Sequence, residues 1–193
     1  KITKNWEDES NKNGKRPSSI KIQLKADGEN SGEPIELKGE KDTWDYIFSN
    51  LPKYNIAGKE ITYTVEERET KENDLKFYQK GTPKKTAEGY TITNTFAVPD
   101  DKINLTINTV WDDDSNKNGK RPSSIKMQLK ADGVNYGDPM LLDGEGDTWT
   151  REIKDLKKYN ESGNEIVYEV EESEANPDDL KFYGLTDTKK EGG

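Results

Sequence analysis

Apolar and polar side chains alternate along much of the chain. Ile20, Ile22 and Leu24 are separated by single polar residues, and the same spacing recurs over 44–48 and 61–65. A period of two is typical of β-strands that bury one face. Residue pairs suited to tight turns separate these runs: Asn13-Gly14, Asp27-Gly28, Lys38-Gly39 and Ala57-Gly58. No long helical stripe competes with the pattern, so we predict an all-β fold.

The whole pattern occurs twice. The segment 11–21 returns unchanged as 116–126, and Trp6 corresponds to Trp111 at an offset of 105 residues. This period is longer than that of solenoid repeats, so each copy should bury a complete core of its own. The predicted boundaries are 1–97 for the first domain, 98–102 for a linker and 103–193 for the second domain.

Roughly seven short strands per copy, joined by polar turns, predict two tandem antiparallel β-sandwich domains of immunoglobulin-like shape. The chain has no cysteine, so the sandwiches lack a disulfide. The second copy has no counterpart of Gly89 to Phe96, and we expect it to lack its last strand. Such an unpaired edge favours strand addition or aggregation. We expect that the sequence was cut from a longer one; a strand donated by another chain is the alternative.

Composition excludes several function classes. A net charge of −9, with Lys and Arg interleaved among acidic residues, disfavours nucleic acid as a partner. No stretch approaches the roughly 20 apolar residues of a membrane helix, so we expect no membrane insertion. The chain starts at Lys1 without a signal peptide, and we expect it to be part of a longer protein.

Histidine and cysteine are both absent, which removes the usual general base, the commonest metal ligand and thiolate metal sites. Paired carboxylates such as Glu66-Glu67 face opposite sides of a strand and cannot converge on one glycosidic bond. We therefore expect neither enzymatic turnover nor a cofactor or metal.

Several ordered motifs cover nearly all of both copies. In the first copy they are Trp6 to Pro17, Leu24 to Gly28, Asn50 to Tyr54, Ile61 to Glu67 and Thr91 to Thr95. In these motifs the chain resembles the B-type repeats of the collagen adhesin, the CnaB family. The resemblance implies a sandwich of the reverse-immunoglobulin type. It also implies a stalk in a wall-anchored adhesin or pilin of a Gram-positive bacterium, outside the cell and on its wall. The implied partners are neighbouring domains of the same surface protein and, through other regions, a host extracellular matrix protein.

The resemblance further implies an internal cross-link. Many similar domains form a spontaneous amide between a first-strand Lys and a last-strand Asn, helped by a central Glu, and the matching residues are Lys4, Asn94 and Glu67. Strand parity agrees, because Lys4 shares a face with Ile2 and Trp6, and the other two residues also alternate with apolar neighbours. Burial would favour a neutral amine and a protonated acid, so Glu67 could protonate the Asn94 carboxamide oxygen as ammonia leaves.

The alternative is that these residues are ordinary surface groups. An isolated Lys or Glu in a strand is usually solvated, and an Asn near a strand end usually makes a turn. In the second copy Thr109 occupies the position of Lys4, although Glu172 matches Glu67. Lys102 is no substitute, because its parity places it on the opposite face. We therefore expect any cross-link to be confined to the first copy.

Two further functions remain open. Asp114-x-Asn116-x-Asn118-Gly119 fits the first half of a calcium loop, but Ile125 stands where a bidentate Glu is required. A polar turn is the commoner reading, and a calcium-stabilised spacer is the alternative. Tyr54, Tyr159 and nearby Lys residues would suit a direct adhesive module that binds a host matrix protein.

Overall fold

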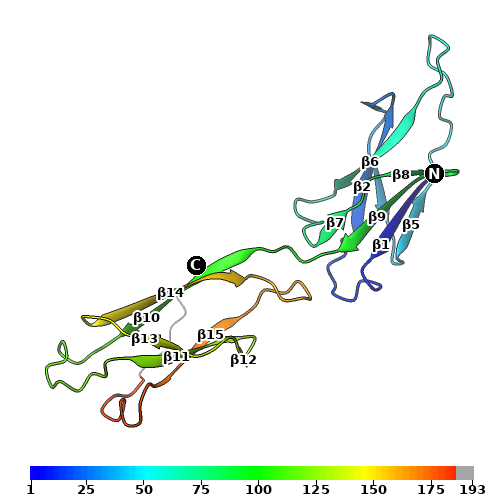
Figure 1. Ribbon diagram of the computed structural model, residues 1–193. Coiled ribbons are helices and arrows are strands. Elements are labelled where there is room, and N and C mark those ends of the chain that lie inside the picture. The colour runs from blue at the N-terminus through cyan, green and yellow to red at the C-terminus, as the bar shows by residue number, and fades with distance from the viewer. Residues whose placement is uncertain (186–193) are drawn as a thin grey trace. The chain divides into compact units, whose positions relative to one another are not determined.

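The computed structural model describes residues 1–185, which contain strands, turns and loops but no helix, and so none that could cross a membrane. The chain forms two compact units, the first containing Lys1–Pro99 and the second beginning at Asp100 (Figure 1). The last strand of the first unit ends at Phe96 and the next strand begins at Lys102. The predicted all-β fold is thereby confirmed.

The first unit contains two sheets. In one sheet the strand order is β5-β1-β9-β7, with β8 also paired to β9, and β1 lies between β5 and β9 (Figure 1). The bounds are β1 (Ile2–Glu7), β5 (Thr43–Tyr46), β7 (Tyr78–Lys80), β8 (Lys84–Thr86) and β9 (Gly89–Phe96).

The first and last strands of this unit are neighbours and run parallel. Lys4 lies opposite Ile92, and Trp6 lies opposite Asn94, whereas every other strand pair in the unit is antiparallel. The alternating pattern predicted antiparallel pairing throughout, because it reports which face a side chain occupies and not the direction of the neighbouring strand. This parallel pairing places the first and last strands side by side, with the start of the unit at one end of the sheet and its last strand ending at the other.

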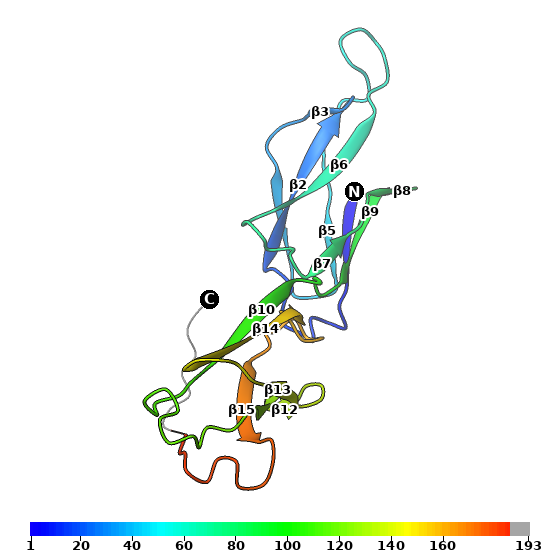
Figure 2. The same ribbon diagram turned by 60° about the vertical axis from the view of Figure 1, so that its left-hand side comes forward.

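The second sheet is built around β2 (Ser19–Ala26). It carries β6 (Tyr63–Glu69) along one edge and β3 (Glu29–Asn30) and β4 (Ile35–Lys38) along the other (Figure 2). Inward side chains of the two sheets meet in one apolar core. Its buried members are Ile2, Trp6, Ile20, Ile22, Leu24, Leu37, Trp44, Val65, Leu75, Tyr78 and Ile92.

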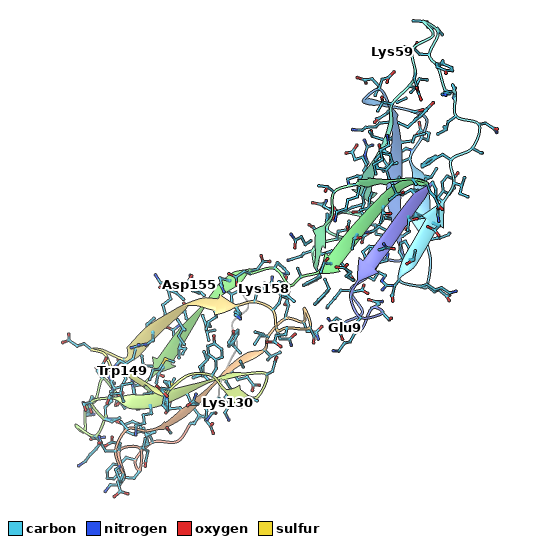
Figure 3. The ribbon with its side chains drawn as sticks, turned by 45° about the vertical axis from the view of Figure 1, so that its right-hand side comes forward. Glu9, Lys59, Lys130, Trp149, Asp155 and Lys158 are labelled. Carbon is cyan, nitrogen blue, oxygen red and sulfur yellow. The ribbon has the colours of Figure 1, made fainter. Side chains whose placement is uncertain are left out.

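A long loop joins β5 to β6 and has Lys59 near its tip (Figure 3). The Asn55 Oδ1 atom accepts hydrogen bonds from the backbone N–H groups of Ala57 and Lys59 at 3.0 and 3.1 Å. The apolar alternation predicted strand over 44–48 and from 61, but β5 ends at Tyr46 and β6 begins at Tyr63. Between the two strands the chain turns at Asn55, and Tyr54 forms an isolated antiparallel bridge with Glu60.

The second unit repeats this plan. β10 pairs with β14 in one sheet, and β11 pairs with β12, β13 and β15 in the other. The bounds are β10 (Lys102–Val110), β11 (Ile125–Ala131), β12 (Val134–Asn135), β13 (Met140–Leu142), β14 (Thr148–Lys157) and β15 (Tyr168–Glu174). Its largest buried cluster contains Ile107, Trp111, Ile125, Met127, Leu142 and Trp149.

The β10 strand has one strand partner in the part of the chain that the structure describes. That partner is β14, with a register shift between Ile103 and Leu105, where the Asp155 backbone N–H donates to the Asn104 Oδ1 atom at 3.2 Å. In the first unit the corresponding strand, β1, pairs on both edges. The expected absence of a last strand also concerns 186–193, which lie outside the described residues.

Candidate functional site

Lys4 lies at the centre of β1 with its side chain fully buried. Alternation along the strand points Ile2, Lys4 and Trp6 into the core, and Thr3 and Asn5 outward. Pairing with β5 and β9 on both edges keeps water from reaching the lysine along the sheet. A lysine at 0% exposure is rare unless its ammonium group has a partner.

Glu67 and Asn94 approach Lys4 from two other strands. Asn94 belongs to β9, beside β1, and is fully buried. Glu67 belongs to β6 in the opposite sheet, where it pairs with Ile22, and its side chain is 5% exposed. The structure thus brings together the three residues that the sequence singled out.

The Glu67 carboxylate contacts both other side chains. Lys4 Nζ lies 3.3 Å from Glu67 Oε1. Asn94 Nδ2 donates to Glu67 Oε1 at 3.2 Å and to Oε2 at 3.0 Å. Lys4 Nζ also donates to the Asn5 carbonyl oxygen at 3.2 Å and lies 4.3 Å from the centroid of the Trp6 ring. The carboxylate therefore bridges the amine and the carboxamide.

Burial changes the acid–base chemistry of the lysine. Desolvation lowers the pKa of Lys4 from 10.5 to about 8, although the nearby Glu67 carboxylate acts in the opposite direction. About a tenth of the Lys4 side chains would then be neutral at pH 7, whereas an exposed lysine is almost entirely charged. The neutral amine is the form that can act as a nucleophile.

The Asn94 carboxamide has a defined orientation. Its nitrogen faces Glu67, and its oxygen accepts a hydrogen bond from the backbone N–H of Gly81 at 3.2 Å. This differs from the expected arrangement, in which Glu67 acted on the oxygen. Glu67 is placed instead against the nitrogen that would leave as ammonia.

Sequence reasoning missed Gly81. It follows β7 and is not among the turn residues that the sequence pattern singled out. Its requirement for glycine comes from tertiary packing: a Cβ atom there would lie 2.1 Å from the Thr93 carbonyl oxygen on β9. Only a residue without a side chain lets this backbone approach Asn94 so closely.

The second unit holds only part of the constellation. Thr109 pairs with Trp149 as Lys4 pairs with Trp44, and Glu172 pairs with Met127 as Glu67 pairs with Ile22. Burial raises the pKa of Glu172. An amide cross-link between side chains needs an amine at the first position, and threonine supplies none.

A charged cluster that the sequence analysis did not identify occurs in both units. In the first unit Arg16 Nε donates to Asp8 Oδ2 at 2.9 Å, Arg16 Nη2 contacts both Asp8 and Asp42, and Tyr78 donates to Asp8 at 2.7 Å. The corresponding residues of the second unit make the same contacts: Asp113, Arg121, Asp147 and Tyr183. The offset of 105 residues between identical residues was the available signal.

Burial acts to raise the pKa of Asp8, but hydrogen bonds from Arg16, Tyr78 and the Asn11 backbone outweigh it, and the pKa is lowered. The pKa of Asp113 is likewise lowered, chiefly by its hydrogen bonds with Arg121. Both clusters therefore favour ionised carboxylates. The charged side chains of each cluster pair with one another within the fold. We therefore assign both clusters to stability and not to chemistry.

The half calcium motif belongs to this cluster. Asp114, Ser115 and Asn116 have φ values of 52°, 57° and 59°, and the Asn116 Oδ1 atom accepts a hydrogen bond from the Arg121 backbone at 3.0 Å. The motif is therefore a tight turn that positions the arginine. Within 1–185 there is no cluster of three or more acidic side chains that could hold a metal ion.

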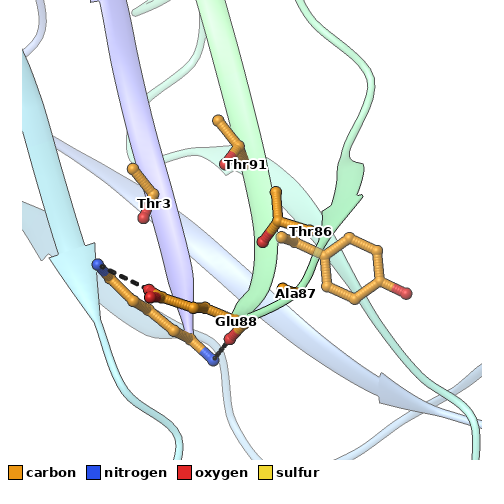
Figure 4. A pocket seen from close by; sticks show the side chains of 7 residues that line it. Thr3, Thr86, Ala87, Glu88 and Thr91 are labelled. Carbon is orange, nitrogen blue, oxygen red and sulfur yellow. Dashed lines mark hydrogen bonds and ion pairs between the residues drawn. The ribbon is translucent and has the colours of Figure 1, made fainter.

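A hollow of about 260 Å³ lies where β1 begins, lined in part by Thr3, Thr86 and Thr91 (Figure 4). The amino group of Lys1 donates to the Glu88 carbonyl oxygen at 3.1 Å, and Lys1 Nζ lies 3.8 Å from Glu88 Oε2. Lys1 thus pairs with Glu88 at the protein surface. The candidate chemistry is therefore assigned to the buried Lys4 and not to Lys1.

The chain is similar to surface-protein sequences of Staphylococcus aureus. The chain is 34% identical over 190 residues to a collagen adhesin of Staphylococcus aureus, and it spans 15% of the length of that relative. Crystal structures of one and of two B repeat units of the collagen binding surface protein of Staphylococcus aureus are each 33% identical. Each match covers 89% of this chain, with 82% and 41% of those chains covered and a TM-score of 0.39 in both cases.

Two consecutive segments match one domain family. Residues 1–95 and 105–191 each match the Cna protein B-type domain, so that each unit corresponds to one copy. Together the two matches cover most of the chain. The chain therefore belongs to the family of Cna protein B-type domains.

Proposed function

We propose that this chain is a spacer segment in the stalk of a wall-anchored, extracellular adhesin, and that its first unit is cross-linked by an amide between Lys4 and Asn94. The observation that carries the proposal is the buried contact of Lys4, Glu67 and Asn94 between neighbouring first and last strands. The similarity to a collagen adhesin supports the surface location.

A bond at this place suits a spacer. β1 and β9 are the first and last strands of the unit, so a pulling force would pass from one to the other through the amide. The residues between Lys4 and Asn94 would not be extended. The bond forms once in each molecule, so the chain does not turn over as an enzyme does.

Intact-mass measurement of the full chain tests the cross-link. Amide formation releases ammonia, so the proposal predicts a mass lower than that of the sequence by one ammonia. The Lys4→Met variant should show the full mass. The matched control is Lys102→Met, because Lys102 is partly exposed in the second unit and pairs with Asp100; this variant should keep the deficit. A wild-type chain with the full mass would contradict the proposal.

A direct adhesive module is the second candidate function. The first unit exposes apolar side chains around its long loop, with Ile47 68%, Tyr54 54% and Ile56 fully exposed. A binding assay on immobilised collagen separates the two functions: a spacer should not bind. Binding that is lost in a Tyr54→Ala, Ile56→Ser double variant would support the adhesive function instead.

A further inference from the structure

We propose that the backbone N–H of Gly81 is a catalytic group in the formation of the Lys4–Asn94 amide. It would hold the carbonyl oxygen of Asn94 and stabilise the negative charge that develops there when the lysine attacks. The inference rests on the cross-link proposed above and adds a group that the side chains alone do not supply.

The hydrogen bonds of Asn94 carry the inference. Both oxygens of Glu67 contact the carboxamide nitrogen, while the carboxamide oxygen points the other way, to the Gly81 N–H at 3.2 Å. A carboxylate in that position cannot stabilise an oxyanion on the far side of the group. Gly81 supplies a donor there, in a site where Asn94 and Lys4 are fully buried. Donors that are fixed before reaction in a water-excluded site are strong electrostatic catalysts.

The fold explains why this donor comes from a glycine. β7 ends at Lys80, which lies opposite Asn94, and Gly81 follows at once. A Cβ atom at Gly81 would lie 2.1 Å from the Thr93 carbonyl oxygen and 3.1 Å from its carbon. Any side chain would push the backbone away from β9 and draw the N–H off the Asn94 oxygen.

The reaction balances with these groups alone. Lys4 first gives a proton to Glu67, and its neutral Nζ then attacks the Asn94 Cγ atom. The π electrons of the carbonyl move to Oδ1, where the hydrogen bond from the Gly81 N–H stabilises the negative charge. Glu67 returns the proton to Nδ2, the C–N bond breaks, and ammonia leaves as the carbonyl re-forms. The remaining excess proton on Nζ passes to Glu67, which leaves a neutral amide.

The test removes the N–H without adding an atom. Gly81 is replaced by glycolic acid, which turns the peptide bond into an ester, in a full chain that is assembled unfolded and folded by dilution from denaturant. Intact mass then follows the loss of ammonia with time. Loss of one oxyanion donor should slow the reaction by about 10²–10³-fold. The control is glycolic acid at Gly58, whose N–H donates to the Asn55 carbonyl oxygen at 2.9 Å in the exposed loop.

The outcomes distinguish the two proposals. If the unmodified chain never loses ammonia, the cross-link fails. If the unmodified chain and the Gly81 ester lose ammonia at equal rates, the role of Gly81 is overturned. A second measurement applies even if the ester does not fold: amide hydrogen exchange at Gly81 in the Lys4→Met chain, with and without Asn94→Leu. Removing the acceptor should speed exchange about tenfold, and unchanged exchange would overturn the proposal.

Discussion

The two units share their fold and differ in the core of one sheet. Both contain the same cluster of one arginine, two aspartates and a tyrosine, with matching contacts. Only the first buries Lys4 beside a glutamate and an asparagine, whereas Thr109 occupies the lysine position in the second. Identical residues at corresponding positions therefore mark what both folds need. At the lysine position, the difference removes the amine that the proposed cross-link needs.

The largest predicted effect comes from Glu67→Gln. The variant should keep the full mass and lower the Tm of the first unit by roughly 20–30 °C, because the cross-link closes a loop of nearly the whole unit and contributes on the order of 4–5 kcal/mol. Differential scanning calorimetry measures the change. The matched control is Glu172→Gln in the second unit, which should not change the mass. An equal loss of Tm in both variants would remove the proposed difference between the units.

A smaller effect is expected from Arg16→Ala. The Arg16 and Asp8 side chains are 5% and 2% exposed, so the substitution leaves a buried carboxylate without its cation and should cost the first unit about 3 kcal/mol. Arg121→Ala should destabilise the second unit in the same way. Urea denaturation measures both. As a control, Arg68→Ala removes an exposed ion pair with Glu66 and should cost less than about 1 kcal/mol. An Arg16→Ala cost no greater than that of Arg68→Ala would show that the cluster is not structural.

Acid should weaken the charged cluster of each unit. Folding lowers the pKa of Asp8 and Asp113 below their ordinary value of 3.8, so the unfolded chain binds protons first as the pH falls. Their stabilisation is therefore complete above about pH 4 and is lost as the pH falls through the folded pKa. Urea denaturation between about pH 5 and pH 2 should show the loss, and Asp8→Asn should flatten the dependence for the first unit. A first unit that keeps the same slope in Asp8→Asn would contradict this.

The smallest predicted effect is that of Glu172→Gln on the stability of the second unit. Burial raises its pKa, so the charged form costs stability above the unfolded pKa of 4.5, and Glu172→Gln should stabilise the second unit at pH 7 by less than about 1 kcal/mol. The gain should vanish near pH 4, where the carboxyl group is protonated in both states. Thermal melts at the two pH values measure it, and a destabilised variant at pH 7 would be the opposite result.

Much of the fold and part of the site could be predicted from the sequence. Alternation fixed which faces are buried, and so it indicated that Lys4, Glu67 and Asn94 point into one core. It could not reveal the parallel pairing of β1 with β9, because side-chain period carries no information on strand direction. Gly81 escaped notice since its role depends on the carbonyl oxygen of Thr93, which only the folded sheet brings close.

Pulling a single chain from its two ends distinguishes a cross-linked first unit from one that is held by packing alone. We expect the second unit to unfold with an extension of roughly 300 Å, whereas a cross-linked first unit should not release the residues between Lys4 and Asn94. The Glu67→Gln chain should show a second unfolding event of similar length. Two such events in the unmodified chain would contradict the account.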